Sequence, residues 1–437
     1  MRTPAATAPA GAADTARPLL ADPTYRLLWL TGLLYYHVYM GEIVVTGWAV
    51  LRLTGSALDV GLAGFSRMLP MLILGLIFGA LADRFRGTTV LLLVQGGGAL
   101  ASAALAILFA LGRAQLWQVC LAALALGCCW TADFSARRAL IAQLQPPDRL
   151  SNAMSLETVS MLGSKIAATA LGGVLLALGG PGLAYAWQAA VFCAGIVLVA
   201  TLARRGRIPR QPPPAGIAVL RLVREGWAAS VRVPIVRGVL LVTVVMNALV
   251  FPYQQIIAVI ADQILHVGAV PMGVLAGSDG LGAIVVAGYL STAARPLRQG
   301  PIFLAGATLA CALIAALALS PLYPLSLAVQ VLLGACMGAF GSLQPALIIG
   351  AMAPELRARA MGVLAMAIGV NPAGILLSGA LSSAIGPSTT LVALGLAALA
   401  LNLMIAATNR TLLRGGAGAG EPAPAATGTA TAREVRR

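Results

Sequence analysis

Ionisable side chains inside long apolar stretches are the residues of this sequence best suited to chemistry. Four of them fall near the middle of such stretches, namely Glu42, Arg67, Lys165 and Asp279. A charge at the centre of a lipid bilayer is costly, so such residues indicate ion or proton pathways, binding sites or buried ion pairs. The formal charges of the four side chains cancel.

Glu42 belongs to a polar and aromatic stripe. Tyr35, Tyr39, Glu42 and Thr46 follow one another at helical spacing and therefore share one face of a helix. One interpretation is a carboxylic acid that merely packs against tyrosine. The interpretation we favour is a protonatable wall of a central cavity, because burial disfavours the charged form and lets the group exchange a proton.

Two basic residues lie at a similar depth. Lys165 is the only lysine of the chain, and a buried lysine can lose its proton whereas arginine effectively cannot. Glu42, Lys165 and Asp279 are therefore the candidate proton-coupling residues. Arg67 allows two interpretations, a binder of an anionic substrate group or the counter-ion of Glu42.

Polar residues interrupt later apolar stretches. Asn247, Phe251 and Gln254 share a face beside a proline, and Asn371 directly precedes another. Polar or broken helix segments at mid-depth often line a binding cavity, although packing between helices explains them equally well. The candidate substrate cavity comprises Tyr35, Tyr39, Arg67, Asn247, Phe251, Gln254 and Asn371.

Motifs of other chemistries are missing from the sequence. It has no G-x-x-x-x-G-K-[ST] phosphate loop, no H-E-x-x-H and no C-x-x-C, and His37 and His266 are isolated. We therefore expect no enzyme activity, no metal site and no cofactor.

Apolar stretches dominate the chain. Hydrophobic residues make up 59% of the 437 residues and charged residues 10%, a balance that excludes an ordinary soluble domain. Stretches of about 20 apolar residues recur along the whole length and predict a helical membrane protein with many spans. The net charge of +15 would suggest nucleic acid in a soluble chain. In a membrane protein, the excess positive charge is explained by basic residues in the loops on the cytoplasmic side of the membrane. We therefore expect no nucleic-acid partner.

The predicted fold class is an all-α membrane protein with twelve transmembrane helices. Their approximate ranges are Leu27–Leu51, Ala57–Ala82, Val90–Leu111, Leu116–Arg137, Ser151–Leu178, Leu183–Ala203, Val239–Ala261, Gly268–Leu290, Pro301–Leu319, Pro324–Met352, Ala360–Ile385 and Thr389–Leu412. If both termini are cytoplasmic, the connections on the opposite side receive only Arg52 and Arg113. The positive-inside rule therefore predicts cytoplasmic termini.

The chain divides into two similar halves. A shift of 207 positions superposes Pro147-Asp148 on Pro354-Glu355, and Gly172 on Gly379. Parallel six-helix repeats produce such a pattern. The predicted organisation is a disordered cytoplasmic lead at 1–25, a six-helix bundle at 26–204, a cytoplasmic linker with an amphipathic helix at 205–236, a second six-helix bundle at 237–412 and a disordered cytoplasmic tail at 413–437.

The turn after the second apolar stretch carries a motif. Gly79-Ala-Leu-Ala-Asp-Arg-Phe-Arg-Gly87 resembles the G-x-L-A-D-R-x-G-R-R loop between helices 2 and 3 of the major facilitator superfamily. Four residues match the pattern, namely Gly79, Leu81, Asp83 and Arg84. The later glycine is displaced to Gly87, and two threonines replace the final basic pair. The resemblance implies the two-bundle fold of that superfamily. Asp83 could also cap the following helix.

Acidic and basic residues also lie nearer to the ends of their apolar stretches. Asp133 and Glu157 have Arg137 and Arg138 within reach, so we interpret them as structural or gating pairs. The candidate gating residues are Gly79, Asp83, Arg84, Asp133 and Arg137.

Further segments resemble the branch of this superfamily that contains enterobactin exporters and macrolide efflux proteins. They are Leu51-Arg-Leu-Thr-Gly-Ser-Ala57 and Asp133-Phe-Ser-Ala-Arg-Arg-Ala139, the latter followed by Arg149-Leu-Ser-Asn-Ala153. The resemblance implies an exporter of organic molecules driven by the proton-motive force. In the superfamily, span 5 packs against span 8, which would bring Lys165 to Asp279. Such a pair fits a functional and a purely structural role equally well.

The predicted function is proton-coupled export of a small organic molecule, such as a drug, an antibiotic or a siderophore, across a bacterial cytoplasmic membrane. The expected partners are the substrate, protons and the lipid bilayer, and we expect a monomer. The alternatives are an importer of the same fold and a non-transporting membrane receptor or scaffold. Accumulation of substrate by energised cells would favour the importer, and a substrate-independent protein partner would favour the receptor.

Overall fold

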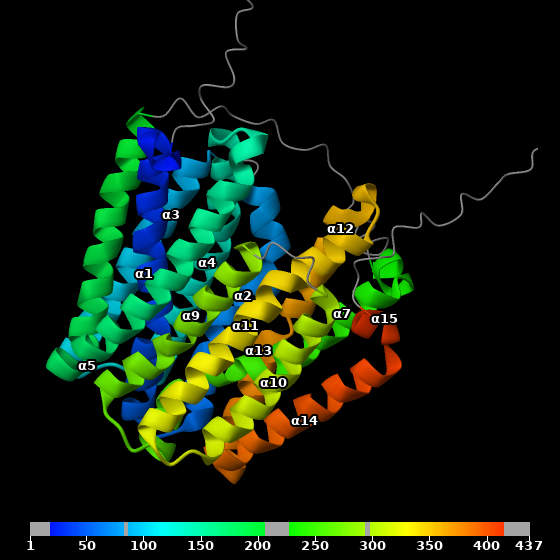
Figure 1. The fold of residues 1–437 in the computed structure, drawn as a ribbon. Helices are drawn as coiled ribbons and strands as arrows, with labels where there is room; N and C mark the ends of the chain where they lie inside the picture. Colours follow the sequence, from blue (N-terminus) through cyan, green and yellow to red (C-terminus); the bar gives the residue numbers. More distant parts are fainter. Residues whose placement is uncertain (1–17, 83–85, 206–226, 293–297, 415–437) are drawn as a thin grey trace, which may run out of the picture.

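The computed structural model describes residues 18–82, 86–205, 227–292 and 298–414, which are folded almost entirely into helices (Figure 1). A single 3-10 turn at Leu19–Ala21 precedes the first long helix.

Helix α1 (Pro23–Thr54) has well-defined ends. Asp22 caps it by accepting a hydrogen bond from the Thr24 amide, and the proline at its first position suits a helix start. Gly55 ends the helix in the left-handed conformation, with φ +68°. The helix thus begins four residues before the expected Leu27 and takes in the end of the predicted lead, because the cap and the proline lie in that segment.

Helices α2 (Ala57–Ala82), α3 (Gly87–Ala110) and α4 (Leu116–Leu144) follow. Helix α5 runs from Pro147 to Arg205, but its backbone is not helical at Gly179 and Gly180. Gly180 adopts φ +65°, which glycine tolerates at little cost. The sequence predicts a turn between two spans at this point, and the break confirms it. In Figure 1, α1 lies beside α5, and α2 packs against α4.

The next span is irregular. The predicted amphipathic linker helix lies mostly outside the described residues, and only 227–232 are seen as helix. The span itself consists of α7 (Pro234–Val245), a π-helical turn (Met246–Val250), a 3-10 turn (Phe251–Gln254), α8 (Ile257–Val259) and a second π-helical turn (Ile260–Ile264). Pro252 has no amide hydrogen, so a regular hydrogen-bond ladder cannot pass through it. The sequence predicts the span and its proline but not the change of helix type.

Seven helices complete the described chain. They are α9 (Ala269–Thr292), α10 (Gln299–Leu319), α11 (Tyr323–Ala351), α12 (Pro354–Ile368), α13 (Asn371–Ile385), α14 (Pro387–Thr408) and the short α15 (Arg410–Arg414). The break between α12 and α13 falls directly before Asn371-Pro372, as the sequence predicts. Within the described ranges, nine helical stretches are long and apolar enough to cross a membrane.

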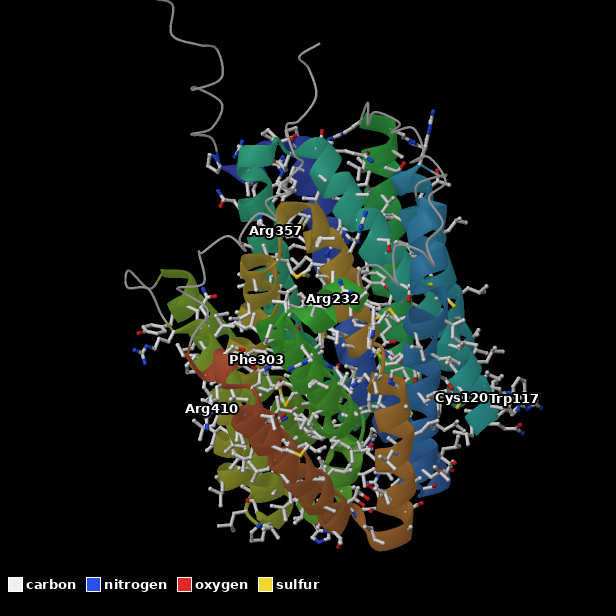
Figure 2. The ribbon with its side chains drawn as sticks, turned by 90° about the vertical axis from the view of Figure 1, so that its right-hand side faces the viewer. Trp117, Cys120, Arg232, Phe303, Arg357 and Arg410 are labelled. Atoms are coloured by element: carbon white, nitrogen blue, oxygen red, sulfur yellow. The ribbon has the colours of Figure 1, made fainter. Side chains whose placement is uncertain are left out.

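The outer face of the helices is apolar. Leu93, Leu100 and Leu178 are each more than 70% exposed. Trp117 projects from the outer face of α4 near Cys120 (Figure 2). So much exposed hydrocarbon would be unfavourable in water and suits the interior of a bilayer.

Two close contacts join helices that are distant in the sequence, α5 with α9 and α2 with α13. A Cβ on Gly61 would lie 3.0 Å from the Cα of Gly379. A Cβ on Gly173 would collide with the Ala269 carbonyl and also approach Gly273. Small residues at these places let the helix backbones touch, and the candidate coupling residues lie on the same set of helices or on α1.

Candidate functional site

Glu42 and Arg67 form a buried ion pair between α1 and α2. The Glu42 carboxylate contacts the Arg67 guanidinium, and the two side chains are 2% and 1% exposed. Glu42 also accepts a hydrogen bond from the Thr46 hydroxyl (2.7 Å), while Arg67 donates one to the Tyr39 carbonyl (2.7 Å). Among the described residues, none accepts a hydrogen bond from Nη1 of Arg67. One carboxylate is thus matched by one cation, and the cation keeps a spare donor.

Aromatic rings lie against this ion pair. The Arg67 guanidinium is 3.9 Å from the centroid of the Tyr39 ring, and Trp130 of α4 stacks on Tyr39 with centroids 3.8 Å apart. Tyr35 lies parallel to Trp130 at 6.2 Å. These cation–π and stacking contacts fix the position of the guanidinium.

A different tyrosine, Tyr185, is linked to the Glu42 carboxylate through the Thr46 hydroxyl. The Tyr185 hydroxyl, from the second part of α5, is 2.8 Å from the Thr46 hydroxyl that donates to Glu42. The packing interpretation placed Tyr35 and Tyr39 of the same helix beside the Glu42 carboxylate. The tyrosine linked to it is instead Tyr185 of another helix, and the link runs through Thr46.

Lys165 and Asp279 form a second ion pair, which joins α5 to α9. The ammonium lies 2.6 Å from the Asp279 carboxylate, and the side chains are 14% and 5% exposed. The Tyr253 hydroxyl is close to Asp279 and Gln330. Within the described part of the chain, that hydroxyl and Oδ1 of Asp279 have no hydrogen-bond partner of regular geometry. A hydroxyl group and a carboxylate oxygen beside the ion pair are therefore able to form further hydrogen bonds.

A small cavity opens next to Lys165. Its walls are Ile43, Val44, Lys165, Thr169, Gln254, Ile257, Ala276 and Gln330. The predicted cavity residue Gln254 and the predicted coupling residue Lys165 therefore share one space.

The remaining predicted cavity residues pack helices together. Asn371 donates to the Asn247 carbonyl (3.2 Å), and Asn247 donates to the Thr243 carbonyl (2.9 Å). The Phe251 ring lies against the Phe340 ring, with centroids 5.8 Å apart. The contacts of Asn371 with Asn247 and of Phe251 with Phe340 join the irregular span to α13 and α11, whereas the bond from Asn247 to Thr243 lies within the span.

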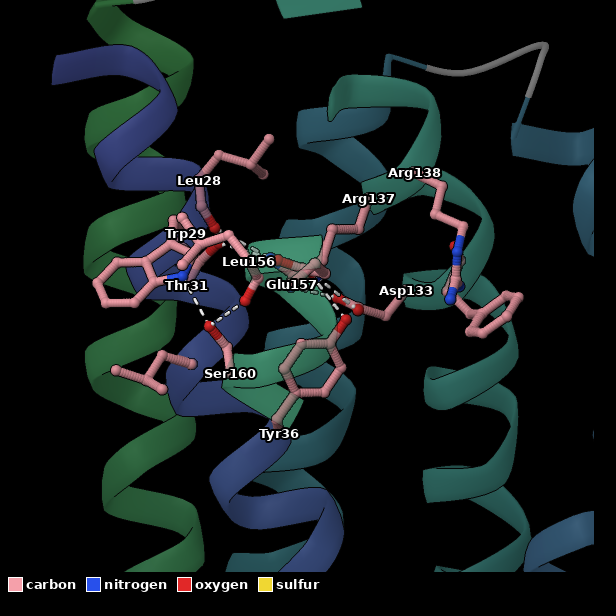
Figure 3. Close-up of polar contacts among 12 residues, drawn as sticks. Leu28, Trp29, Thr31, Tyr36, Asp133, Arg137, Arg138, Leu156, Glu157 and Ser160 are labelled. Carbon is pink, nitrogen blue, oxygen red and sulfur yellow. Dashed lines mark hydrogen bonds and ion pairs between the residues drawn. The ribbon is translucent and has the colours of Figure 1, made fainter. Parts of the chain in front are cut away.

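Asp133 and Arg137 belong to a buried network between α1, α4 and α5 (Figure 3). Nε and Nη2 of Arg137 donate to the two carboxylate oxygens of Asp133, at 2.9 and 2.6 Å. Nη1 donates to the Leu28 carbonyl and the Thr31 hydroxyl of α1. Glu157 of α5 completes the network, with Oε1 3.6 Å from Nε of Arg137. Arg137 thereby fastens α4 to α1.

The gating motif is only partly described. Gly79 lies near the end of α2, while Asp83 and Arg84 lie outside the described residues. The N-cap position of α3 belongs to Arg86, whose side chain makes no capping hydrogen bond. The predicted cap by Asp83 falls outside the described residues.

A further ion pair lies at the far end of α1. Arg52 contacts Asp262 of the second π-helical turn at 2.8 Å, with side chains 55% and 31% exposed. The Arg52 guanidinium also lies 4.3 Å from the Trp48 ring centroid. The two charges are 210 positions apart at span ends, where a charge carries no signal in the sequence.

Several site residues escaped the sequence analysis. Tyr253 and Gln330 flank the Lys165–Asp279 pair, whereas Trp130 and Tyr185 flank the Glu42–Arg67 pair. Gln330 lies in the middle of an apolar stretch, and the signal that identified Gln254 would have found it. Among the described residues, no group of three or more His, Cys, Asp or Glu side chains could hold a metal ion.

Solved transporters share this fold. A bacterial homologue of the human lysosomal transporter Spinster, in an inward-facing and unoccupied conformation, superposes with a TM-score of 0.69 over 90% of this chain and 98% of its own, at 17% identity. A POT family transporter in complex with a thioalcohol-conjugated peptide gives a TM-score of 0.72 over 89% and 96%, at 12% identity. At such low identity the likeness shows the fold alone, which is that of major facilitator transporters.

The sequence places the chain more narrowly. It belongs to the transmembrane secretion effector family of the major facilitator superfamily, whose profile matches residues 14–423. Similar proteins include the multidrug efflux pump Tap of Mycolicibacterium fortuitum, 28% identical over 83% of this chain and 90% of that protein. Tap of Mycobacterium tuberculosis strain H37Rv is 26% identical over 81% and 86%. The protein is therefore a multi-pass membrane transporter and not an enzyme.

Proposed function

We propose that this transporter is a proton-coupled exporter of small organic molecules. The observation that carries the proposal is the buried Glu42–Arg67 ion pair. A carboxylate held by one cation in a membrane-spanning helix can exchange that cation for a proton when its surroundings change between wet and dry. The relatives named multidrug efflux pumps support the outward direction and organic substrates such as drugs or antibiotics. Siderophores remain within the proposed substrate class.

The proposed architecture has twelve spans in two six-helix bundles, at 26–204 and 237–412. Helix α5 then counts as two spans divided at Gly179 and Gly180, and α1 and α2 are added to the long apolar helices. Both termini would be cytoplasmic in a bacterial inner membrane, because every arginine except Arg52, Arg67 and Arg113 then belongs to that side.

A reporter fusion tests this orientation. Alkaline phosphatase fused at Gly415 should be inactive, and the same enzyme inserted at Gly180 should be active. The opposite result would overturn the orientation.

The proposed cycle closes each side of the bundles in turn around a midplane site. The Gly173–Gly273 contact and the Arg52–Asp262 pair lie at the end that the orientation places outside. Their presence supports a state closed to the outside. Opening that side would separate α5 from α9 and break the Lys165–Asp279 pair, so water, a proton or substrate would then have to satisfy both charges.

Substrate and gating roles complete the proposal. The proposed cavity side chains are Tyr35, Tyr39, Arg67, Asn247, Phe251, Gln254 and Asn371. The proposed gate combines the loop at Gly79, Asp83 and Arg84 with Asp133 and Arg137. The transporter would act as a monomer with protons and lipid as its other partners.

A comparison of cells tests the function. Media from a deletion strain complemented with the parent protein, with Glu42→Gln or with an empty vector are compared by mass spectrometry. We expect at least one organic compound to appear only with the parent protein and to disappear on addition of an uncoupler. Identical media from all three strains, or accumulation of a compound inside the parent cells, would contradict export.

A further inference from the structure

Glu157, on the first part of α5, is a buried acidic residue that belongs to neither of the two midplane ion pairs. Its carboxyl is buried, with the residue 5% exposed, and faces α1 and α4 (Figure 3). Oε1 accepts a hydrogen bond from the Tyr36 hydroxyl at 2.7 Å. A Cβ on Gly32 would lie 3.2 Å from the same oxygen and 2.9 Å from Nη1 of Arg137, so α1 packs tightly onto the network. Glu157 is thus enclosed by protein.

The nearest cation is already neutralised by another carboxylate. Nε and Nη2 of Arg137 donate to Asp133 in a bidentate ion pair, and Nη1 donates to the Leu28 carbonyl and the Thr31 hydroxyl. Four of its five N–H groups are thereby used, and the 3.6 Å separation between Nε and Oε1 of Glu157 is too long for a hydrogen bond. One buried cation therefore faces two carboxyl groups and bonds only one of them.

No other described cation takes the place of Arg137. Arg138 also comes from α4, but its guanidinium lies 3.3 Å from the Phe134 ring centroid and Nη1 donates to the Phe134 carbonyl. From α1, the groups that face Glu157 are the phenols of Tyr25 and Tyr36. On α5 itself, no charged residue lies within one turn of Glu157.

We propose that Glu157 is a proton-binding site of this transporter, separate from Glu42 and from the Lys165–Asp279 pair. The proton adds to Oε2, while Oε1 remains the acceptor of the Tyr36 hydroxyl, so protonation costs no hydrogen bond of the network. Asp133 is the poorer site, because both of its oxygens already accept from Arg137. The network then holds one negative and one positive charge, which a low-dielectric interior favours over a net negative charge.

Loss of this proton has a structural consequence. An ionised Glu157 would compete with Asp133 for Arg137, which also holds α1 through the Leu28 carbonyl and Thr31. Proton occupancy at Glu157 thereby determines how firmly α1, α4 and α5 are joined. The inference concerns occupancy and does not depend on whether Glu42 couples transport to protons.

Infrared spectroscopy of the full chain, reconstituted in lipid at neutral pH, tests the site. The parent protein should show the C=O stretch of a buried protonated carboxyl group, and Glu157→Gln should lack that component while its amide still accepts from Tyr36. Tyr36→Phe should keep the band at higher wavenumber, because the hydrogen bond to the carbonyl oxygen is lost. Thr158→Ala, an exposed neighbour on α5, is the matched control and should leave the band unchanged.

A fourth variant tests the reason for protonation. Asp133→Asn weakens the hold on Nε and Nη2 of Arg137, so Glu157 should ionise against the freed guanidinium and the band should disappear. The proposal is overturned if Glu157→Gln has the same carboxyl spectrum as the parent. If Glu157→Gln does not fold, an unshifted band in Tyr36→Phe overturns it instead. Since the measurement reports bound protons and not transport, it stands apart from any failure of the proposed export.

Discussion

The ammonium of Lys165 and the carboxylate of Asp279 are 114 positions apart in the sequence and 2.6 Å apart in the structure. The only lysine of the chain is therefore paired with Asp279 of α9, and the counter-ion of Glu42 is Arg67. The resemblance to the superfamily implied the pairing of Lys165 with Asp279, and the counter-ion of Glu42 was one of the two interpretations of Arg67. The two ion pairs differ in what they connect. The Glu42–Arg67 pair lies within the first half of the chain, and the Lys165–Asp279 pair joins α5 of the first half to α9 of the second.

Removal of Lys165 should destabilise the protein through the charge left behind. Lys165→Met leaves Asp279 buried without a cation, and breaking a buried pair costs roughly 3–5 kcal/mol. Chemical denaturation of the purified protein in detergent measures the effect.

The double variant Lys165→Met, Asp279→Leu is the control for that experiment. It removes both charges and should recover most of the lost stability. If the double variant is as unstable as the sum of its single variants, the two residues do not act as a pair.

Gly173 should be needed for closure of α5 against α9. A Cβ at this position collides with the Ala269 carbonyl, and overpacking of this kind costs about 1–3 kcal/mol. Gly173→Ala should therefore be inserted into the membrane but transport several-fold more slowly. Gly163→Ala on the same helix has open space around the new Cβ and serves as the matched control. Equal rates for the two variants in membrane vesicles would contradict the closure role.

The Arg52–Asp262 pair should contribute little to stability. Both side chains are partly exposed, and exposed pairs give roughly 0.2–1 kcal/mol. We expect Asp262→Asn to lower the melting temperature only slightly, and the difference from the parent to vanish at high salt because ions screen the pair. A large, salt-independent loss would show that Asp262 has a structural role beyond this ion pair.

The helices could be predicted from the sequence because local signals mark them. Two glycines and a proline mark the break in α5, and Asn371-Pro372 marks the break before α13. The two π-helical turns of the span that contains Pro252 could not be predicted, because the proline indicates an interruption of the helix but not the type of turn that replaces it.

The ion pairs show where prediction from one sequence ends. The charged residues inside the apolar stretches were found, since a charge there is conspicuous, whereas Arg52 and Asp262 at span ends were not identified as a pair. The residues alone left Arg67 as one of two possibilities beside Glu42, and the pairing of Lys165 with Asp279 came only from the resemblance. Both pairings depend on the rotation of α1, α2, α5 and α9 about their axes, which composition does not contain. One of the groups that accept a hydrogen bond from Arg137 is the backbone carbonyl of Leu28. A backbone acceptor of this kind cannot be predicted from the pattern of side chains.

The last prediction concerns coupling at Glu42. This carboxylate contacts Arg67 and accepts from Thr46, while Arg67 keeps an unused donor at Nη1. A proton arriving at Glu42 would release Arg67 to bind a substrate acceptor, and departure of the proton would restore the pair. Glu42→Gln imitates the protonated state permanently. We therefore expect it to bind substrate and to exchange it across a symmetric membrane, but not to expel it against a gradient. Proteoliposomes with and without an imposed pH gradient separate the two activities. The control is the double variant Glu42→Gln, Arg67→Gln, which should lose substrate binding as well as gradient-driven transport. Full gradient-driven transport by Glu42→Gln would place the coupling site elsewhere, and Asp279 beside Tyr253 would become the leading candidate.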